Sequence, residues 1–401
     1  MWFSKHQVPH TVVDKSSFPR DKVCGDAISG KVFSILKQLE PDMAQQLAER
    51  QQEALITHGV TFGAPSGDEM TLAFNQFAPK QSDGKPNPTP GFVIKREHFD
   101  NFLFEKINPE YADLHQQTSL KNIFREEGGQ VVAQLKKGKE DWEVRPKIVI
   151  AADGERSIVN KQLAEYRNAD RYFAGAVRAY YTDVTGFNDL NAIELHYIKE
   201  AVPGYLWFFP LPNGGCNVGM GMLSSHIKKG KRNLRKEMLE VLENHPKFKE
   251  RFKNAELQGK VVGWGLPLGS KKREISGDNY ILTGDAASLI DPFTGEGVGN
   301  AVISGKYAAV YAMEALEVQD YSKEFFQKRY DQKIYDKLWR EFQISHTLQR
   351  LGAYPVLINF IFKIAKSSKN MQDTLAMMFT DIDLRKQLKN PLFYFRMLLG
   401  K

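Results

Sequence analysis

The chain has 401 residues, of which 42% are hydrophobic and 26% charged, so it has the composition of a globular protein with room for two or three domains of about 100–200 residues. It has no run of about 18 apolar residues, which argues against a membrane-spanning helix. Residues 1–15 lack the apolar stretch of a signal peptide, so we expect a cytoplasmic location. Cys24 and Cys216 have no disulfide or zinc spacing, and Pro9 separates His6 from His10, so we predict no metal site.

The net charge of +7 and the pI near 9.0 predict a soluble protein with a basic face. Attraction to anionic lipid headgroups is the alternative, in which the protein associates with a membrane surface. No nucleic-acid-binding motif accompanies the charge, so we do not expect nucleic acid as a partner.

Hydrophobic periodicity and turn residues predict a mixed α/β chain. In chain order we predict a helix exit and a buried strand at 8–14, a helix at 29–39, a loop at 78–90, a helix at 96–107, a hairpin of strands 122–127 and 130–134, a central parallel strand at 147–152, an antiparallel sheet within 172–221, a helix at 232–243, a strand at 280–283, a helix at 298–316 and helices beyond 321. The pattern is that of one sheet fold interrupted by a second sheet and closed by helices.

The segment 281–300 carries the strongest chemical signal. A strand ends at Thr283, and Gly284 permits a tight turn with close backbone approach. Asp285 then offers a carboxylate at the edge where open α/β sheets bind ligands, and this carboxylate suits a ribose or ribityl hydroxyl.

Gly295, Gly297 and Gly299 leave backbone N–H groups uncovered around the start of the helix at Val298. The positive end of a helix can stabilise an anionic oxygen or nitrogen of a ligand. The alternative is a glycine-rich loop before an ordinary helix.

Three further segments contain candidate binding residues: two are strands followed by an aspartate, and one is a strand with alternating aromatic residues. An apolar strand leads into Asp153-Gly154, and another ends at Asp14, where dinucleotide-binding folds place an acid on the adenosine ribose. Tyr205, Trp207 and Phe209 alternate along a strand and therefore share one face, where they can form a flat apolar wall. A common strand–turn–helix and an aromatic core strand are the structural alternatives.

Together these segments resemble the aromatic-hydroxylase flavoprotein superfamily, and specifically its geranylgeranyl reductase branch. Gly284-Asp285 resembles the second FAD fingerprint of the superfamily, and Asp153-Gly154 resembles its Asp-Gly motif. The run Lys22-x-Cys24-Gly25 and the pattern YxWxFP-x8-GxG, which starts at Tyr205 and ends at Gly221, are similar to those of the reductase branch. At position 14 the family more often has Glu, so Asp14 is a departure.

The resemblance implies an α/β fold with a Rossmann-like FAD-binding domain interleaved with an antiparallel-sheet substrate domain, followed by C-terminal helices. The expected boundaries are 1–60, 92–165 and 271–325 for the FAD-binding domain, 61–91 and 166–270 for the substrate domain, and 326–401 for the helical region. The residues expected at the cofactor are Asp14, Arg96, Asp153, Gly154, Gly284, Asp285, Pro292, Gly295, Gly297, Val298, Gly299 and Asn300.

The implied activity is reduction of isoprenoid C=C bonds of a prenyl lipid or quinone, with FAD as cofactor and NAD(P)H or ferredoxin as electron donor. Tyr205, Trp207 and Phe209 would line the substrate chain, and Cys24 would face the flavin or substrate; a small buried core residue is the alternative for Cys24. An FAD-dependent monooxygenase or halogenase, or a non-catalytic lipid-binding remnant, are the other hypotheses.

The glycine-rich GxGxxG loop of this fold usually precedes the acidic ribose ligand by about 20 residues. Only thirteen residues precede Asp14, and none is glycine. We therefore expect that the first strand, its loop and most of the following helix are missing and that the sequence starts at an internal methionine. Translation of the DNA upstream of Met1 tests this expectation, and an in-frame stop directly before Met1 would contradict it.

Two apolar stretches near the C-terminus, 354–365 and 391–399, contain Lys or Arg among bulky apolar residues. A basic amphipathic helix of this kind can lie at a membrane surface, and it can equally cap a hydrophobic tunnel or pack on the core.

Overall fold

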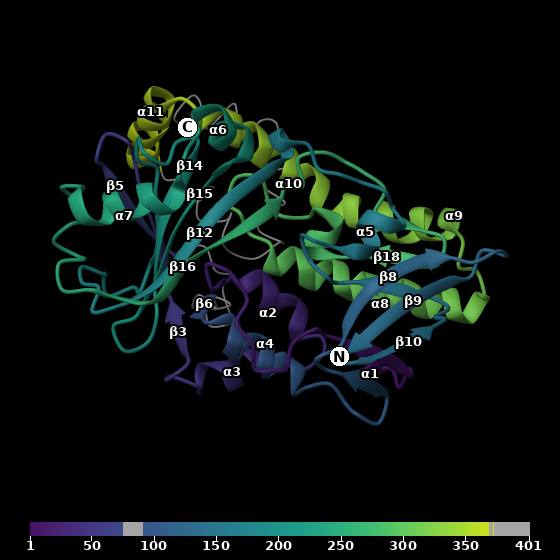
Figure 1. Ribbon diagram of the computed structural model, residues 1–401. Helices are drawn as coiled ribbons and strands as arrows, with labels where there is room; N and C mark the ends of the chain where they lie inside the picture. Colours follow the sequence, from purple (N-terminus) through teal and green to yellow (C-terminus); the bar gives the residue numbers. More distant parts are fainter. Residues whose placement is uncertain (75–90, 369–371, 373–401) are drawn as a thin grey trace. The chain divides into compact units, whose positions relative to one another are not determined.

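The structure is a computed structural model that describes residues 1–74, 91–368 and 372 (Figure 1). The chain divides into two compact units. Unit 1 comprises Met1–Lys22, Arg96–Phe173 and Leu266–His346, and unit 2 comprises Val23–Lys95, Ala174–Gly265 and Thr347–Lys401. The predicted loop at 78–90 and the apolar stretch at 391–399 lie outside the described residues.

Unit 1 contains three small sheets. These are the parallel pair β1 (His10–Val13) and β7 (Ala112–His115), the antiparallel sheet of β8 (Ser119–Arg125), β9 (Val131–Lys137) and β10 (Glu140–Val144), and a sheet in the order β11 (Val149–Ala151), β18 (Tyr280–Leu282), β17 (Ser276–Gly277). The helical elements are α1 (Trp2–Lys5), α4 (Arg96–Phe104), α5 (Ile158–Gln162), η2 (Asp170–Tyr172), η3 (Gly284–Ala287), α8 (Val298–Val318), α9 (Lys323–Phe326), the π-helical turn η4 (Gln327–Asp331) and most of α10 (Gln332–Leu351).

The predicted elements of unit 1 are present, with two corrections. β1 is not buried, because its residues alternate between half-buried and exposed and Val13 is 36% exposed. β11 lies at the end of its described sheet, with β18 as its neighbour, and is not a central strand. A continuous apolar run indicates cover on both faces of a strand, but it does not fix the number of neighbouring strands.

Unit 2 is built on a sheet of seven strands in the order β16 (Glu256–Pro267), β12 (Phe173–Thr182), β15 (Cys216–Leu223), β14 (Gly204–Pro210), β13 (Ile193–His196), β4 (Gly59–Gly63), β5 (Glu69–Ala73). β13 and β4 are parallel, and the strands from β12 to β13 are antiparallel, as predicted for 172–221. The remaining elements in the described residues of unit 2 are β2 (Ala27–Ile28), β3 (Ala54–Thr57), β6 (Gly91–Ile94), α2 (Gly30–Leu36), α3 (Met43–Ala48), α6 (Ser224–Gly230), α7 (Leu234–Asn244) and α11 (Pro355–Ser367).

The core of unit 2 lies on one face of this sheet. Leu206 and Phe208 of β14 and Val218 of β15 are fully buried on this face, and helix α7 covers it (Figure 1). Helix α7 presents apolar residues at the i, i+4, i+7, i+8 spacing, from Leu234 to Leu242, and begins after Asn233, whose side chain accepts a hydrogen bond from the backbone N–H of Lys236. The opposite face of β14 therefore carries Tyr205, Trp207 and Phe209.

The compact units divide the chain differently from the predicted domains. Residues 23–60 and 92–95, expected with the FAD-binding domain, belong to unit 2, where β2 and β3 both pair with β6. The C-terminal helices do not form a separate unit, since α9 and η4 belong to unit 1 and α11 to unit 2. None of the described helices combines the length and the apolar character needed to cross a bilayer.

Candidate functional site

The parallel pairing of β11 with β18 brings two predicted motifs to one sheet edge. Ala151 is the register partner of Leu282, and both strands end there. Asp153 and Gly154 follow β11 directly, while Gly284 and Asp285 follow β18. The two motifs, which are about 130 residues apart in the sequence, therefore lie at one carboxyl edge, the place where open α/β sheets bind ligands.

The turn after β18 explains the glycine at position 284. Gly284 has a φ of +52°, and a Cβ there would lie 3.0 Å from the Cβ of Ala301 on α8. Its N–H donates to the hydroxyl of Ser304, also on α8, over 2.9 Å. Glycine therefore allows the end of β18 to lie directly against the first turns of α8.

Helix α8 begins at Val298 with no side chain capping its N-terminus. A Cβ placed on Gly297, the N-cap residue, would lie 3.5 Å from a carboxylate oxygen of Asp285. The half-buried Asp285 is thus next to the uncapped N–H groups of a long helix. This geometry fits a ligand with two features: a hydroxyl group that donates to the carboxylate, and an anionic edge that faces the helix N-terminus.

The loop before α8 is held by two buried side chains. One carboxylate oxygen of Asp291 accepts hydrogen bonds from the backbone N–H groups of Phe293 and Thr294, at 2.9 and 2.8 Å, and the other accepts from the hydroxyl of Ser345. The amide of the fully buried Asn300 donates to the Leu289 carbonyl over 2.7 Å. Asp291 was not predicted, although an acid before a Pro-Phe-Thr-Gly turn is a local signal for it.

The predicted ribose ligand Asp14 belongs to a cluster of four charged side chains. Arg20 contacts Asp14 at 3.5 Å and Asp100 at 2.8 Å, and Arg96 binds Asp100 with two nitrogen atoms. Burial acts to raise the pKa of Asp100, but Arg96 and Arg20 hold it below its ordinary value. Arg96 is therefore paired with a carboxylate, and its role at a cofactor stays a prediction.

Unit 2 presents the predicted aromatic wall. The ring of Trp207 lies 6.1 Å from that of Tyr205 and 6.2 Å from that of Phe209, measured between centroids. Tyr197 extends the row next to Tyr205, at 5.9 Å. The three predicted residues are thus brought together on one face of β14.

The cross-strand register explains why two glycines accompany the wall. Trp207 lies opposite Gly219, and Tyr205 lies opposite Gly221. A Cβ on Gly219 would lie 1.9 Å from Cζ2 of Trp207, so only glycine leaves room for the indole to lie across β15. The YxWxFP-x8-GxG pattern is therefore the sequence of two paired strands.

The segment 24–26 lies against the same wall. A Cβ on Gly25 would lie 2.9 Å from the Phe209 ring, so the backbone packs directly on that ring. Asp26 is fully buried and has a φ of +68°, and its carboxylate accepts hydrogen bonds from the Tyr180 hydroxyl and the Asn217 amide, both at 2.7 Å. Cys24 is a half-buried free thiol beside them in the sequence.

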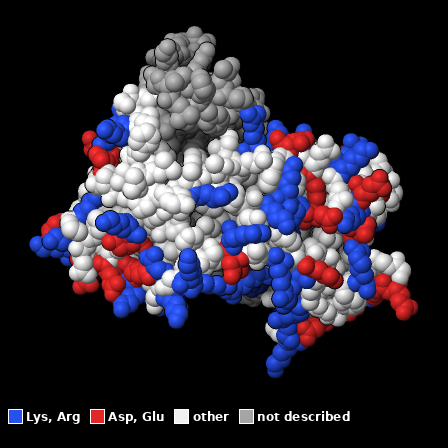
Figure 2. All heavy atoms as spheres, turned by 90° about the horizontal axis from the view of Figure 1, so that it is seen from above, with Lys and Arg blue, Asp and Glu red and all other residues white. Residues whose placement is uncertain are grey.

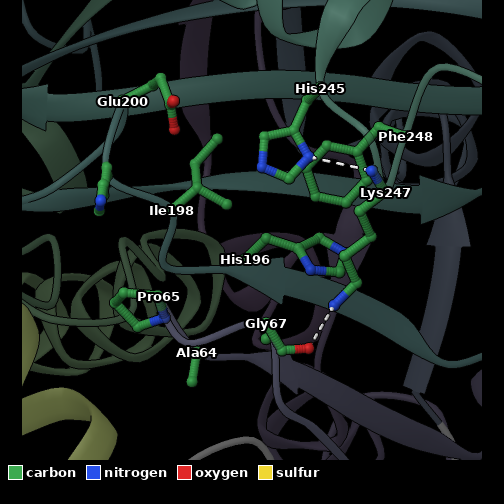
Figure 3. Close-up of a pocket in the computed structure, with 11 residues that line it drawn as sticks. Ala64, Pro65, Gly67, His196, Ile198, Glu200, His245, Lys247 and Phe248 are labelled. Carbon is green, nitrogen blue, oxygen red and sulfur yellow. Dashed lines mark hydrogen bonds between the residues drawn. The ribbon is translucent and has the colours of Figure 1, made fainter.

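A pocket of about 230 Å³ lies on the other face of the sheet of unit 2 (Figure 3). His196 and Glu194 share this face with Leu206 and Phe208, as the register of β13 and β14 shows. The pocket is lined by Gly63, Ala64, Pro65, Gly67, His196, Ile198, Lys199, Glu200, His245, Lys247 and Phe248. It is therefore separate from the aromatic wall, and sequence reasoning did not find it.

His196, which lines this pocket, belongs to a buried ion network. Glu194 binds Arg251 at 2.6 and 2.9 Å and His196 at 2.8 Å, and although burial acts to raise the pKa of Glu194, these partners hold it below its ordinary value. The Nδ1 atom of His196 has no hydrogen-bond partner and lies 3.7 Å from Glu69. The lining mixes Lys199 and Lys247 with Glu200, so it does not select one sign of ligand charge.

The comparison with protein families decides what this fold is. A model of the family described as FAD binding domain matches residues 5–316. The chain belongs to this family. The sheet edge with Asp153 and Asp285 is in the matched part of the FAD binding domain. No group of three His, Cys, Asp or Glu side chains in the described residues of this family member has the arrangement of a metal site.

Two relatives of this FAD binding domain are named as reductases. The digeranylgeranylglycerophospholipid reductase of Thermoplasma acidophilum is 34% identical over 262 residues, which are 64% of this chain and 62% of the relative. The menaquinone reductase of Mycobacterium tuberculosis is 26% identical over 350 residues, 86% of this chain and 78% of the relative. The predicted resemblance to geranylgeranyl reductases is confirmed, although the match spans less than two thirds of the length of the first curated relatives.

Two solved structures share this fold. The crystal structure of a geranylgeranyl bacteriochlorophyll reductase-like protein from Thermoplasma acidophilum superposes with a TM-score of 0.78 and 25% identity, and the match covers 97% of this chain and 94% of that one. The flavin-dependent brominase Bmp2 has a TM-score of 0.72 and 19% identity, with the same coverage, and shares the fold alone. The predicted α/β fold class is confirmed.

Proposed function

We propose that this protein is an FAD-dependent oxidoreductase that reduces isoprenoid C=C bonds of a prenyl lipid or a prenylated quinone. The observation that carries the proposal is that one chain contains both an FAD binding domain and the wall of Tyr205, Trp207 and Phe209 with its two glycines. Relatives named as digeranylgeranylglycerophospholipid reductase and menaquinone reductase support it. The reactions named there share an apolar isoprenoid substrate.

The residues of unit 1 fit the FAD that the family implies. Asp285 would accept a hydrogen bond from the ribityl chain, and the N–H groups at the start of α8 would stabilise the negative charge on the pyrimidine edge of the reduced flavin. Asp153 and Gly154 would lie near the pyrophosphate at the same edge. When bound and reduced, the flavin supplies a hydride to one carbon of the double bond.

The second carbon of the double bond must receive a proton, so that the hydride and the proton together convert C=C to CH–CH. The wall residues would hold the isoprenoid chain flat and exclude water through apolar contact. We propose Cys24, in the motif Lys22-x-Cys24-Gly25, as the candidate donor of this proton. NAD(P)H or ferredoxin would supply the electrons that reduce the flavin. Peripheral contact with a membrane would give the protein access to an apolar substrate.

Mass spectrometry of the lipids and quinones from a deletion strain tests the proposal. We expect prenyl chains with more double bonds in the deletion strain, and restored saturation when the wild-type gene is returned. A gene carrying Asp285→Ala serves as the control that keeps the wall but loses the ribityl contact. Unchanged saturation of every prenyl chain in the deletion strain would contradict the proposal.

A further inference from the structure

The side chain of Asn217 connects three segments of unit 2 that are far apart in the sequence. Asn217 is fully buried on β15, directly opposite Phe209. Its amide oxygen accepts from the indole N–H of Trp207 over 2.9 Å. Its amide nitrogen donates to the Cys24 carbonyl over 2.8 Å and to the Asp26 carboxylate over 2.7 Å. Both N–H donors of the amide are therefore used.

The partners of Asn217 fix the orientation of its amide. In the flipped orientation the amide nitrogen would face the Trp207 N–H, so two donors would meet, and the amide oxygen would face the Asp26 carboxylate, so two acceptors would meet. In a buried site each mismatch leaves polar groups without partners, which costs about 1–3 kcal/mol per group. Aspartate has nearly the same shape, but it offers no donor when ionised and one donor when protonated, whereas the asparagine amide offers two.

The segment that Asn217 binds is anchored on its other side as well. The Asp26 carbonyl accepts from the backbone N–H of Ile94 over 3.0 Å, and β2 begins at the next residue. The carboxylate of Asp26 also accepts from Tyr180. The close approach of Gly25 to the ring of Phe209 leaves no space for movement toward the wall. Asn217 is thus the link between a fixed loop and the indole of Trp207.

We propose that Asn217 is a positioning residue that locks the segment Cys24–Asp26 against the aromatic wall and sets the spacing between Cys24 and Trp207. The identity of the ligand that lies on the wall rests on the proposed function. We call the hydrogen bonds of Asn217 with Trp207, Cys24 and Asp26 the lock. The lock does not rest on the proposed function, because all these contacts are within unit 2 and are present without substrate.

The variant Asn217→Asp tests the lock through pH. It places a carboxylate where an amide nitrogen lies 2.7 Å from the Asp26 oxygen. Two carboxylates at this distance repel when both are ionised and share a proton when the pH falls. Tyr180 donates to Asp26, and Arg178 and Lys95 lie over its ring, so these ionisable groups are close to the pair; the substitution leaves all three unchanged. In the variant, the segment Cys24–Asp26 should therefore be released from position 217 near pH 8 and held there again toward pH 5.

The readout is the rate at which Cys24 reacts with iodoacetamide, expressed as the ratio of variant to wild type at each pH. Cys216 is fully buried and burial raises the pKa of its thiol well above the ordinary value, so the label reports Cys24. We expect the ratio to be about tenfold at pH 8 and to fall toward one near pH 5, since lost charge-assisted hydrogen bonds are worth about that factor. Asn233→Asp is the matched control, because an aspartate caps α7 as well as asparagine does.

A double variant, Asn217→Asp with Asp26→Asn, returns an amide beside a carboxylate and should remove the pH dependence of the labelling ratio. The ratio should fall below that of Asn217→Asp at pH 8 but stay above one, because the carboxylate at position 217 cannot donate to the Cys24 carbonyl. If Asn217→Asp alone fails to fold, Trp207→Phe removes the indole N–H together with part of the ring and should still raise the labelling rate. A ratio that stays at one, or a raised ratio that neither depends on pH nor is rescued by the double variant, would overturn the inference.

Assay of prenyl-lipid reduction separates this inference from the proposed function. If the labelling behaves as expected and wild type reduces no prenyl substrate, the lock stands and the function fails. If wild type reduces the substrate, the lock predicts that Asn217→Asp raises KM at pH 8 more than at pH 5, because the wall and the loop no longer hold one geometry. An equal KM for both proteins at pH 8 would overturn the positioning role.

Discussion

At the scale of single residues, Gly219 tests the account of the aromatic wall. A Cβ on Gly219 would lie 1.9 Å from Trp207 and 2.4 Å from the Val177 carbonyl oxygen. We expect Gly219→Ala to lower the free energy of unfolding by about 1–3 kcal/mol, because the indole or the strand must move. Urea unfolding followed by tryptophan fluorescence measures this change.

Gly221 on the same strand is the control for Gly219. A Cβ there meets Ala176 at 3.6 Å, which is an ordinary contact, so Gly221→Ala should leave stability within about 0.5 kcal/mol of wild type. Equal stability of the two variants would show that the indole does not depend on Gly219.

The carboxyl of Asp331 predicts a pH dependence of stability in unit 1. Burial raises its pKa to about 6, although Ser276 and the backbone N–H of Ile275 donate to it and act to lower the pKa. The folded protein therefore keeps a proton that the unfolded chain releases near pH 4. The free energy of unfolding should fall by roughly 2–3 kcal/mol as the pH rises from about 4 to about 6, and this contribution should then stay constant.

Asp331→Asn removes the ionisable group and should remove this contribution. Urea unfolding of both proteins at a series of pH values between 4 and 7 gives the difference in stability as a function of pH. A difference that does not change over this range would contradict the raised pKa.

At the scale of elements, helix α8 offers two glycines with different surroundings. A Cβ on Gly297 would cover the start of the helix, 3.3 Å from Ile290 and 3.5 Å from Asp285, whereas a Cβ on Gly305 would meet nothing within 4 Å. We expect Gly297→Ala to weaken FAD binding by about tenfold, because the methyl group lies over the N–H groups that should face the flavin.

Gly305→Ala should bind FAD as wild type does and should raise the stability of α8 by about 1 kcal/mol, since alanine replaces glycine inside a helix. Flavin-fluorescence titration and thermal unfolding measure both quantities. Equal FAD affinity of the two variants would argue against the helix terminus as the flavin site.

The elements that the sequence predicted are those whose signal is local. The strand, turn and helix from Tyr280 to Val318 form one continuous segment, so their periodicity and glycines show them directly. The hairpin at Gly128-Gly129 was found for the same reason, and both glycines have a positive φ, +99° and +87°. Element ends were placed less well, because α4 stops at Phe104 although its apolar pattern continues.

The parts that the sequence could not predict depend on which strands become neighbours. Asn217 was missed because its meaning comes from lying opposite Phe209 and from contacts with Cys24 and Asp26, which are about 190 residues away. A lone polar residue in the apolar strand 216–223 was the one signal available. The ion network of Glu194, His196 and Arg251 likewise needs the fold to bring it together.

At the scale of the whole molecule, charge does not by itself indicate a partner. The chain carries a net charge of +7, yet Lys and Arg are interspersed with Asp and Glu over the face shown in Figure 2. The more specific feature for contact with a membrane is α11 with its N-cap residue Tyr354: Tyr354, Val356 and Phe360 are 64, 83 and 57% exposed. Lys363 on the same helix is a candidate contact for anionic headgroups, whereas Lys366 is paired with Asp68.

We expect replacement of both Val356 and Phe360 by Glu to reduce binding to vesicles that contain anionic lipid by about tenfold, because apolar area is lost and negative charge is added. Co-sedimentation with vesicles measures it. Leu257→Glu, at a position that is 41% exposed on β16, is the control and should bind as wild type does. Equal binding of both variants would argue against contact through α11.

Anaerobic turnover of the purified protein with FAD, a chemical reductant and a digeranylgeranyl lipid is the most direct test of the central claim. The account predicts products that gain two hydrogens per reduced double bond in the absence of oxygen, with little product from Asp285→Ala. No saturation without oxygen, together with an oxygenated or halogenated product when oxygen and halide are supplied, would contradict it.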